Sequence, residues 1–325
     1  MDEKRFIKAV LLHLSHNMWC EWPADPSEDA RLGSKAPDRT LTLNEGVWKR
    51  SVDLAAAKGM NLLLIDVGDA VAFPSHPELA IKGSWSVERI QAELARIKKL
   101  GMEPIPKLNF SNTHNGWLKE YRRMVSTPDY YNVCADVIRD TAEIFGHPRF
   151  LHIGYDEETF NHQSGLDFVA VRQGELWWHD FLWFVKTVEA TGMLPWIWSD
   201  YGWHHPEFVT RCPKSVMQSN WYYDEVMEGF DIPKMKSHAP LVKLFLDLEK
   251  AGFEQIPCGS NWNSGYRRKH GPARNDSMKE LMAFCRKNIS PKNLKGFMMA
   301  TWAMCRTEED FNKIKEGLDI FADNV

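Results

Sequence analysis

The sequence predicts a single (β/α)8 TIM barrel, an α/β fold, and three observations lead to it. Apolar, strand-like segments alternate along the 325 residues with segments of helical periodicity. These strand candidates number eight, as a closed barrel requires: residues 7–15, 60–68, 103–111, 150–157, 194–200, 215–223, 255–262 and 294–302. No proline-, glycine- or serine-rich linker divides the chain, so we expect one domain over residues 1–325.

The helices between these strands have recognisable ends. Ser86 is a favourable N-cap, the apolar residues after it recur at spacings of three and four, and Gly101 ends that helix. Thr127 is followed by Pro128, which is well tolerated at the first helical position. Thr307 precedes three acidic residues and is expected to begin the last helix. One further helix has an aromatic packing face: Trp177, Phe181, Phe184 and Val188.

Composition excludes several classes of function. The net charge of −4 and the pI of about 6.3 imply no basic face, so we expect no nucleic-acid partner. No segment approaches the length of a membrane span. The six cysteines are scattered without a C-x-x-C pair, which predicts neither a zinc site nor a disulfide framework but reduced, buried thiols.

The N-terminal segment has a charged start and a short apolar run without a small-residue cleavage site. As written, the chain is expected to be cytoplasmic, or periplasmic or secreted if an export signal was trimmed. A homo-oligomer is compatible with the sequence.

Polar residues are expected to converge at one rim of the barrel. Because side chains alternate along a strand, one set should face the helices: Ile65, Leu108, Ile153 and Ile197. The other set should then reach the carboxyl ends of four strands: Asp66, Asn109, Asp156 and Asp200. Active sites of TIM barrels lie at this rim, so we expect these residues around the mouth of a pocket.

Asp156 and Glu157 are adjacent where the fourth strand ends, and both can turn toward the mouth. Neighbouring carboxyl groups disfavour each other's ionisation, so one can remain protonated near neutral pH. A protonated carboxyl can donate to a glycosidic oxygen while its ionised neighbour stabilises positive charge on the sugar.

Tryptophans at successive strand ends favour a sugar as the ligand. Trp196 and Trp198 lie on the inner face of the fifth strand, and Trp221, Trp262 and Trp302 lie at the ends of the next three. Such rings can pack against the apolar face of a pyranose, or they can close the top of the barrel core.

Four segments resemble glycoside hydrolase family 20, the β-N-acetylhexosaminidases. "HIGYDE" (152–157) resembles the family's H-x-G-G-D-E motif. "KGMNLLLIDVGDAVAFPSHPEL" (58–79) resembles its second strand with the H-x-x-D segment, and "GMEPIPKLNFSNTHNGW" (101–117) resembles its third strand. "KGFMMATWAM" (295–304) resembles its last strand with a pocket tryptophan. The resemblance covers roughly residues 59–303.

The resemblance implies a retaining, exo-acting glycosidase with Glu157 as general acid/base. Asp156 would orient and polarise the substrate's 2-acetamido group, which acts as the nucleophile in that family. His152 and His114 would support the acid pair, and Asp69 would stand at the family's aspartate. The predicted substrate-binding residues are Asp66, Asp69, Lys107, Asn109, His114, His152, Trp198, Asp200, Trp221, Tyr223, Trp262 and Trp302. For this glycosidase interpretation, we expect no cofactor and no metal.

The chain departs from the family at positions that read the substrate. Asp66 replaces a histidine, Asn109 an aspartate and Lys107 a glutamate. An inward Lys107 would keep nearby carboxylates ionised unless it pairs with Asp66 or Asp156. The first strand lacks the arginine that grips the sugar's hydroxyls. The tyrosine that holds the acetamido oxygen has three candidates: Tyr222, Tyr223 and Tyr266.

Two alternatives remain open. The first is a metal-dependent sugar-processing barrel, with ligands drawn from His13, His16, Asp66, Asp200, His204, His205 and Glu207. The second is a carbohydrate-binding barrel that has lost its chemistry. A basic segment, residues 266–276, could lie over the mouth and contact an anionic sugar, although a solvated loop is the simpler expectation.

Overall fold

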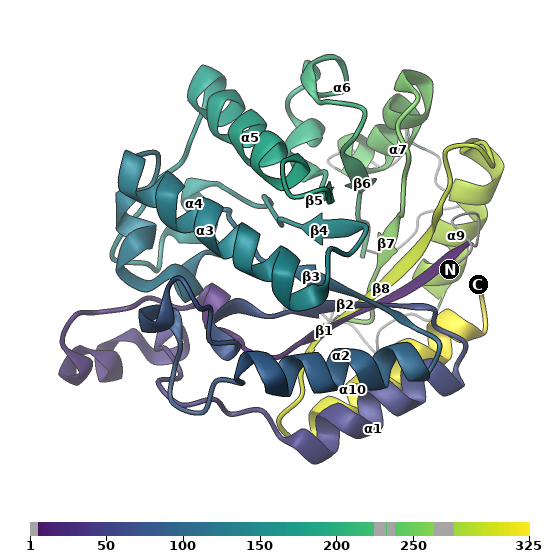
Figure 1. The fold of residues 1–325 in the computed structure, drawn as a ribbon. Helices are drawn as coiled ribbons and strands as arrows, with labels where there is room; N and C mark the ends of the chain where they lie inside the picture. Colours follow the sequence, from purple (N-terminus) through teal and green to yellow (C-terminus); the bar gives the residue numbers. More distant parts are fainter. Residues whose placement is uncertain (1–5, 224–231, 233–237, 263–275) are drawn as a thin grey trace.

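The computed structural model describes residues 6–223, 232, 238–262 and 276–325, and Figure 1 shows how they are arranged. The strands are β1 (Ile7–His13), β2 (Leu62–Asp66), β3 (Glu103–Lys107), β4 (Phe150–His152), β5 (Leu194–Trp198), β6 (Met217–Ser219), β7 (Cys258–Gly259) and β8 (Gly296–Met304). They form one parallel sheet in the order β6-β5-β4-β3-β2-β1-β8-β7. Isolated parallel bridges, Gln218 to Gln255 and Trp221 to Cys258, join its two ends. The predicted (β/α)8 barrel is confirmed.

Helices lie outside the strands. The α-helices are α1 (Glu45–Ala57), α2 (Val87–Lys99), α3 (Pro128–Phe145), α4 (Phe160–Gln163), α5 (Gly174–Glu189), α6 (Phe208–Arg211), α7 (Ala239–Ala251), α9 (Asp276–Asn288) and α10 (Glu308–Ala322). Short 3₁₀ helices are η1 (Asn17–Trp19), η2 (Pro26–Lys35), η3 (Gly68–Ala70), η4 (Pro77–Leu79), η5 (Gly116–Met124) and η6 (Asp200–Trp203). Among the described residues, no helix has both the length and the apolarity that a membrane crossing needs.

The predicted helix starts are confirmed by their capping bonds. The side chain of Ser86 accepts from the backbone N–H of Arg89, and that of Thr127 accepts from the N–H of Tyr130. Thr307 forms a reciprocal capping box at the start of α10. Seven of the eight strands are shorter than predicted, most clearly β6 and β7, whereas β8 keeps the predicted length and is shifted by two residues. The strand β4 ends five residues before position 157.

Two apolar layers surround the strands, and both follow the predicted alternation. The outer layer, between sheet and helices, includes Ile65, Leu108, Ile153 and Ile197. The inner layer fills the barrel and includes Trp196 and Trp198 from β5. All six cysteines are free and buried, as predicted.

A row of polar residues crosses the barrel interior directly below the mouth. His13, Asp66, Lys107 and His152 are register neighbours on β1, β2, β3 and β4. Lys107 is fully buried, and its Nζ lies 2.5 Å from Oδ2 of Asp66. The His13 ring lies on the other side of the same carboxylate, with Nδ1 3.4 Å from Oδ2. The inward lysine therefore pairs with Asp66, one of the two partners considered for it from the sequence.

Replacing Lys107 with methionine should lower the free energy of unfolding by about 3–5 kcal/mol, because it leaves the Asp66 carboxylate buried without its cation. Urea denaturation at neutral pH measures this loss. Lys315→Met, which removes an exposed i,i+4 pair with Asp319 on α10, is the control and should change stability far less. Equal effects of the two substitutions would contradict the importance of the buried pair.

Candidate active site

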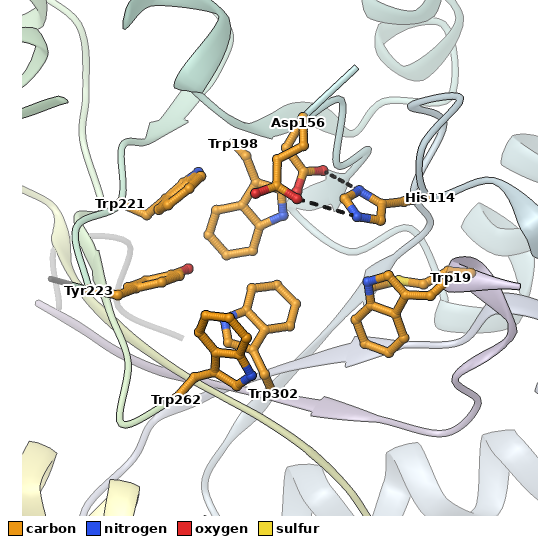
Figure 2. Close-up of a pocket in the computed structure, with 10 residues that line it drawn as sticks. Trp19, His114, Asp156, Trp198, Trp221, Tyr223, Trp262 and Trp302 are labelled. Carbon is orange, nitrogen blue, oxygen red and sulfur yellow. Dashed lines mark ion pairs between the residues drawn. The ribbon is translucent and has the colours of Figure 1, made fainter. Parts of the chain in front are cut away.

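A cavity of about 510 Å³ opens at the carboxyl ends of the strands, and Figure 2 shows the side chains around it. Its lining comprises Met18, Trp19, His114, Asp156, Glu157, Trp198, Trp221, Tyr223, Trp262 and Trp302. All except Met18 and Trp19 belong to the predicted site. These two residues lie in or at the end of the short turn that follows β1, where strand periodicity gives no signal. Their position just beyond the carboxyl end of a barrel strand is the clue that could have identified them.

The aromatic residues form walls around an open space. Trp221 and Tyr223 are stacked with ring centroids 4.9 Å apart, and Trp302 contacts Trp198 at 5.8 Å. Trp262 remains 45% exposed, so it borders the opening of the cavity. Of the two interpretations drawn from the sequence, the cavity favours a pocket wall for these tryptophans, whereas Trp196 is fully buried in the barrel core below.

The first of the three consecutive acids, Asp156, is held in its ionised form. Its Oδ1 accepts from Nδ2 of Asn109 at 2.7 Å and lies 3.3 Å from Nδ1 of His114. Burial opposes ionisation, but His114, Lys107 and Asn109 together outweigh it and place the pKa of Asp156 below its ordinary value.

The second acid, Glu157, has the opposite bias. Burial raises the pKa of Glu157 above its ordinary value, and the charge of Asp156 adds to this effect while His114 opposes it. Its carboxylate lies 3.6 Å from the His114 ring and 3.5 Å from that of His162, and no described residue donates a hydrogen bond to it. Of the two adjacent acids, Glu157 is therefore the one suited to carry a proton.

The third acid, Glu158, turns away from the cavity. Its side chain is 4% exposed and forms a forked ion pair with Arg172. Neither residue was assigned a role from the sequence.

His114 connects the two acids that face the cavity, and Figure 2 marks both ion pairs. Burial would lower the pKa of His114, but Asp156 and Glu157 outweigh it and raise the pKa. In its protonated form His114 stabilises the ionised carboxylate of Asp156.

The backbone after β4 has an unusual conformation that separates the acids. Gly154, Tyr155 and Glu157 all have positive φ angles, of 67°, 75° and 54°. Tyr155 occupies the second glycine of the resembled motif, and it keeps a backbone conformation that glycine adopts most easily. A Cβ on Gly154 would lie 2.2 Å from the amide of Asn109, so the glycine also makes room for the side chain that holds Asp156.

Six predicted substrate-binding residues lie behind the cavity wall instead of in it: Asp66, Asp69, Lys107, Asn109, His152 and Asp200. All six are buried side chains on the strands or within three residues of a strand end, and none of them lines the cavity. His152 forms no described hydrogen bond or ion pair with Asp156 or Glu157. Its Nδ1 accepts from the N–H of Gly154, and its ring packs on that of Trp198 with the ring centroids 4.6 Å apart. Asp200 accepts from the backbone N–H of Glu157 at 2.9 Å.

Asp69 supports the turn after β1, whose residues Met18 and Trp19 line the cavity and were not predicted from the sequence. Its Oδ2 accepts from Nδ2 of Asn17 at 2.7 Å, and Asn17 begins the turn that presents Met18 and Trp19. Burial raises the pKa of Asp69 to about 6. Asp69 thus acts on the cavity through Asn17.

The predicted metal ligands do not assemble into one group. His13 pairs with Asp66 inside the barrel, His16 pairs with Asp38, and His205 lies beside Glu207. Among the described residues, metal-like spacing occurs at His114, Asp156 and Glu157, which offer ligand atoms within 4.8 Å of one another. The basic segment 266–276 and the candidate Tyr266 lie outside the described residues, apart from Asp276 at the start of α9.

Fold and site together define a (β/α)8 barrel with an acidic, tryptophan-walled cavity, and solved structures share this fold. A β-N-acetylhexosaminidase from Bacteroides fragilis has a TM-score of 0.59 at 12% identity, with 96% of this chain and 65% of that one covered. A GH20 exo-β-N-acetylglucosaminidase from Vibrio harveyi in complex with N-acetylglucosamine has a TM-score of 0.59 at 13%, with 98% and 54% covered. A mutant Streptomyces plicatus β-hexosaminidase in complex with GlcNAc has a TM-score of 0.64 at 12%, with 98% and 64% covered.

This chain therefore spans about half to two thirds of the length of these proteins. Its sequence matches no family model and no curated protein. The resemblance drawn from the four sequence segments is confirmed at the level of the fold.

Asp200 should make stability depend on pH. Burial and the charge of Asp156 raise the pKa of Asp200 to about 8, against about 3.9 for an unperturbed aspartate. Between these values the folded protein keeps a proton that the unfolded chain has released, so this group lowers stability as pH rises. Asp200→Asn keeps an acceptor for Glu157 but cannot lose that proton.

The stability of Asp200→Asn relative to wild type should therefore increase from pH 4 to pH 8 by at least about 1.4 kcal/mol, the equivalent of one pKa unit. Urea unfolding of both proteins at several pH values measures the difference. A constant difference across this range would show that Asp200 ionises normally.

Proposed function

We propose that this protein is a retaining, exo-acting glycoside hydrolase that removes a terminal β-linked N-acetylhexosamine. The observation that supports this most strongly is the opposite pKa bias of Asp156 and Glu157 beside one aromatic cavity. The N-acetylhexosaminidase names of the proteins that share its fold agree with this assignment.

In the proposed first step, Glu157 donates its proton to the glycosidic oxygen as the bond from that oxygen to the anomeric carbon breaks. The carbonyl oxygen of the 2-acetamido group attacks the anomeric carbon, and ionised Asp156 stabilises the resulting oxazolinium ion. In the second step Glu157 takes a proton from water, which attacks the same carbon and reopens the ring. Two inversions at the anomeric carbon give net retention.

Tyr223 is the residue that we assign to the acetamido oxygen. Figure 2 shows its hydroxyl pointing into the cavity, whereas Tyr222 is buried in the outer layer between sheet and helices. The charge of Asp156 contributes to the raised pKa of Tyr223, after burial and Cys258, so the two groups lie within electrostatic range. A neutral phenol remains a hydrogen-bond donor across the physiological pH range.

In this proposal the residues that contact the sugar's hydroxyls differ from those of glycoside hydrolase family 20. The turn after β1 contributes Met18 and Trp19 to the cavity, and the first strand has no arginine. Apolar packing against Trp19 replaces part of the charged grip. Asp66 and Lys107, which replace the family's histidine and glutamate, form an ion pair beneath the site. Neither residue lines the cavity, so in this proposal neither contacts the substrate.

A metal-dependent barrel enzyme is a second candidate, because His114, Asp156 and Glu157 have ligand-like spacing. Loss of activity in EDTA with recovery on adding Zn²⁺ or Mn²⁺ would favour it.

Binding of N-acetylglucosamine without turnover of any glycoside would instead favour a carbohydrate-binding barrel.

Glu157→Gln should lower kcat on 4-methylumbelliferyl N-acetyl-β-D-glucosaminide by about 10²–10⁴-fold, because the amide cannot donate an acidic proton. Asp156→Asn should also lower kcat, since a neutral amide stabilises the cation less. Steady-state fluorescence assays measure both values. Full activity of Glu157→Gln would remove this residue from the mechanism.

Tyr223→Phe tests the acetamido contact. Loss of its hydroxyl should lower kcat/KM on the same substrate by about 10-fold, the equivalent of one hydrogen bond of about 1.4 kcal/mol. Tyr222→Phe, one residue away but on the opposite face, is the matched control and should keep the wild-type kcat/KM. The reverse pattern would assign the role to Tyr222.

A further inference from the structure

Successive residues of the loop after β3, residues 111–114, contact the acidic residues 156–158 that follow β4. Ser111 donates its hydroxyl to the backbone oxygen of Asp156 at 2.5 Å, and Thr113 donates to that of Glu157 at 2.6 Å. His114 then pairs with the side chains of both acids. The separation between His114 and the acids is therefore set by how residues 111–114 lie against residues 156–158.

Glu158 makes the contact that closes this arrangement. Its Oε2 accepts from the backbone N–H of Asn112 at 2.9 Å and from Nη2 of Arg172 at 2.6 Å. Its Oε1 accepts from the backbone N–H and from Nε of Arg172, at 2.8 and 2.9 Å. Four donors thus surround a carboxylate that is 4% exposed, and one of them lies two residues before His114.

Arg172 is itself fixed on its remaining sides. Its Nη1 donates to Asp180 at 3.1 Å, and its Nη2 also donates to the backbone oxygen of Phe110 at 2.9 Å. The guanidinium lies over the ring of Tyr155, 4.7 Å from its centroid. Glu158 is therefore tied to α5 through Asp180, to the loop after β3 through Phe110 and to the left-handed turn after β4 through Tyr155.

We propose that Glu158 is a positioning residue that holds His114 in register with Asp156 and Glu157 through the Asn112 N–H. This inference rests on the proposed glycosidase function. Glu158 does not line the cavity, so its effect reaches the reaction through His114 and the acid pair. Displacing such groups by about 1 Å can cost about 10²-fold in rate.

Glu158→Gln tests the proposal with little change in volume. One acceptor oxygen becomes an amide that must face either the Asn112 N–H or the Arg172 guanidinium, both of which are donors. Glu93→Gln is the matched control: Glu93 is 2% exposed on α2, pairs with Arg96 and accepts from Nε1 of Trp48, away from the cavity. Both variants lose a buried forked contact, so both are expected to lose stability.

The two variants should differ in their kinetics. On 4-methylumbelliferyl N-acetyl-β-D-glucosaminide, Glu158→Gln should lower kcat about 10–100-fold with KM changed less than about 3-fold. On the 2,4-dinitrophenyl glycoside, whose leaving group needs little protonation, the loss in kcat should be much smaller. Glu93→Gln should keep the wild-type kcat on both substrates.

A kcat for Glu158→Gln equal to that of Glu93→Gln, or an equal loss on both leaving groups, would overturn the positioning role while the glycosidase function stands. A wild-type protein that hydrolyses neither substrate would contradict the proposed function itself, and this inference with it.

Thr113→Val provides the test if Glu158→Gln does not fold, because it removes the bond to the Glu157 backbone and leaves the buried ion pair intact. The same preference for the dinitrophenyl substrate, with a smaller loss in kcat, is expected. Wild-type kcat on both substrates would show that the loop does not set the geometry of the acids.

Discussion

The rest of the site depends on how the carboxyl groups of three consecutive acids, residues 156–158, are kept apart in different environments. Carboxylates cannot be buried together without partners, and each one here has a different environment. Asp156 is held ionised by Asn109 and His114, while Glu158 is surrounded by donors from Arg172 and Asn112. Only Glu157 faces the cavity without a described hydrogen-bond donor to its carboxylate. The partners of Asp156 and Glu158 allow these two carboxylates to be buried, and the same arrangement leaves Glu157 able to carry a proton.

The barrel supplies this arrangement through its backbone. Positive φ angles at Gly154, Tyr155 and Glu157 end β4 early and turn successive side chains in different directions. Such conformations are costly for non-glycine residues and persist where the surroundings fix them, as the Tyr155 ring is fixed by aromatic packing and by Arg172. Beneath this turn, the Asp66–Lys107 pair balances charge inside the barrel, so two of the three residues that depart from the resembled motifs compensate each other.

The sequence predicts the barrel well because each strand and helix has a local signal, such as an apolar run, a cap or a helical spacing. It also predicts most of the cavity wall, since residues that follow parallel strands meet at one rim. It fails where a contact joins distant segments or where the backbone leaves regular structure. Trp19 lies on a 3₁₀ turn, Arg172 reaches Glu158 across a loop, and Asp66 is buried against Lys107 and does not line the cavity. None of these placements follows from periodicity.

The most direct test of this account is a ¹³C NMR titration of the side-chain carboxyl groups, with signals assigned by their loss in Glu157→Gln and Asp156→Asn. We expect Glu157 to titrate above an ordinary glutamate and Asp156 below an ordinary aspartate. A titration in which Glu157 loses its proton at or below the pH at which Asp156 does would contradict this expectation.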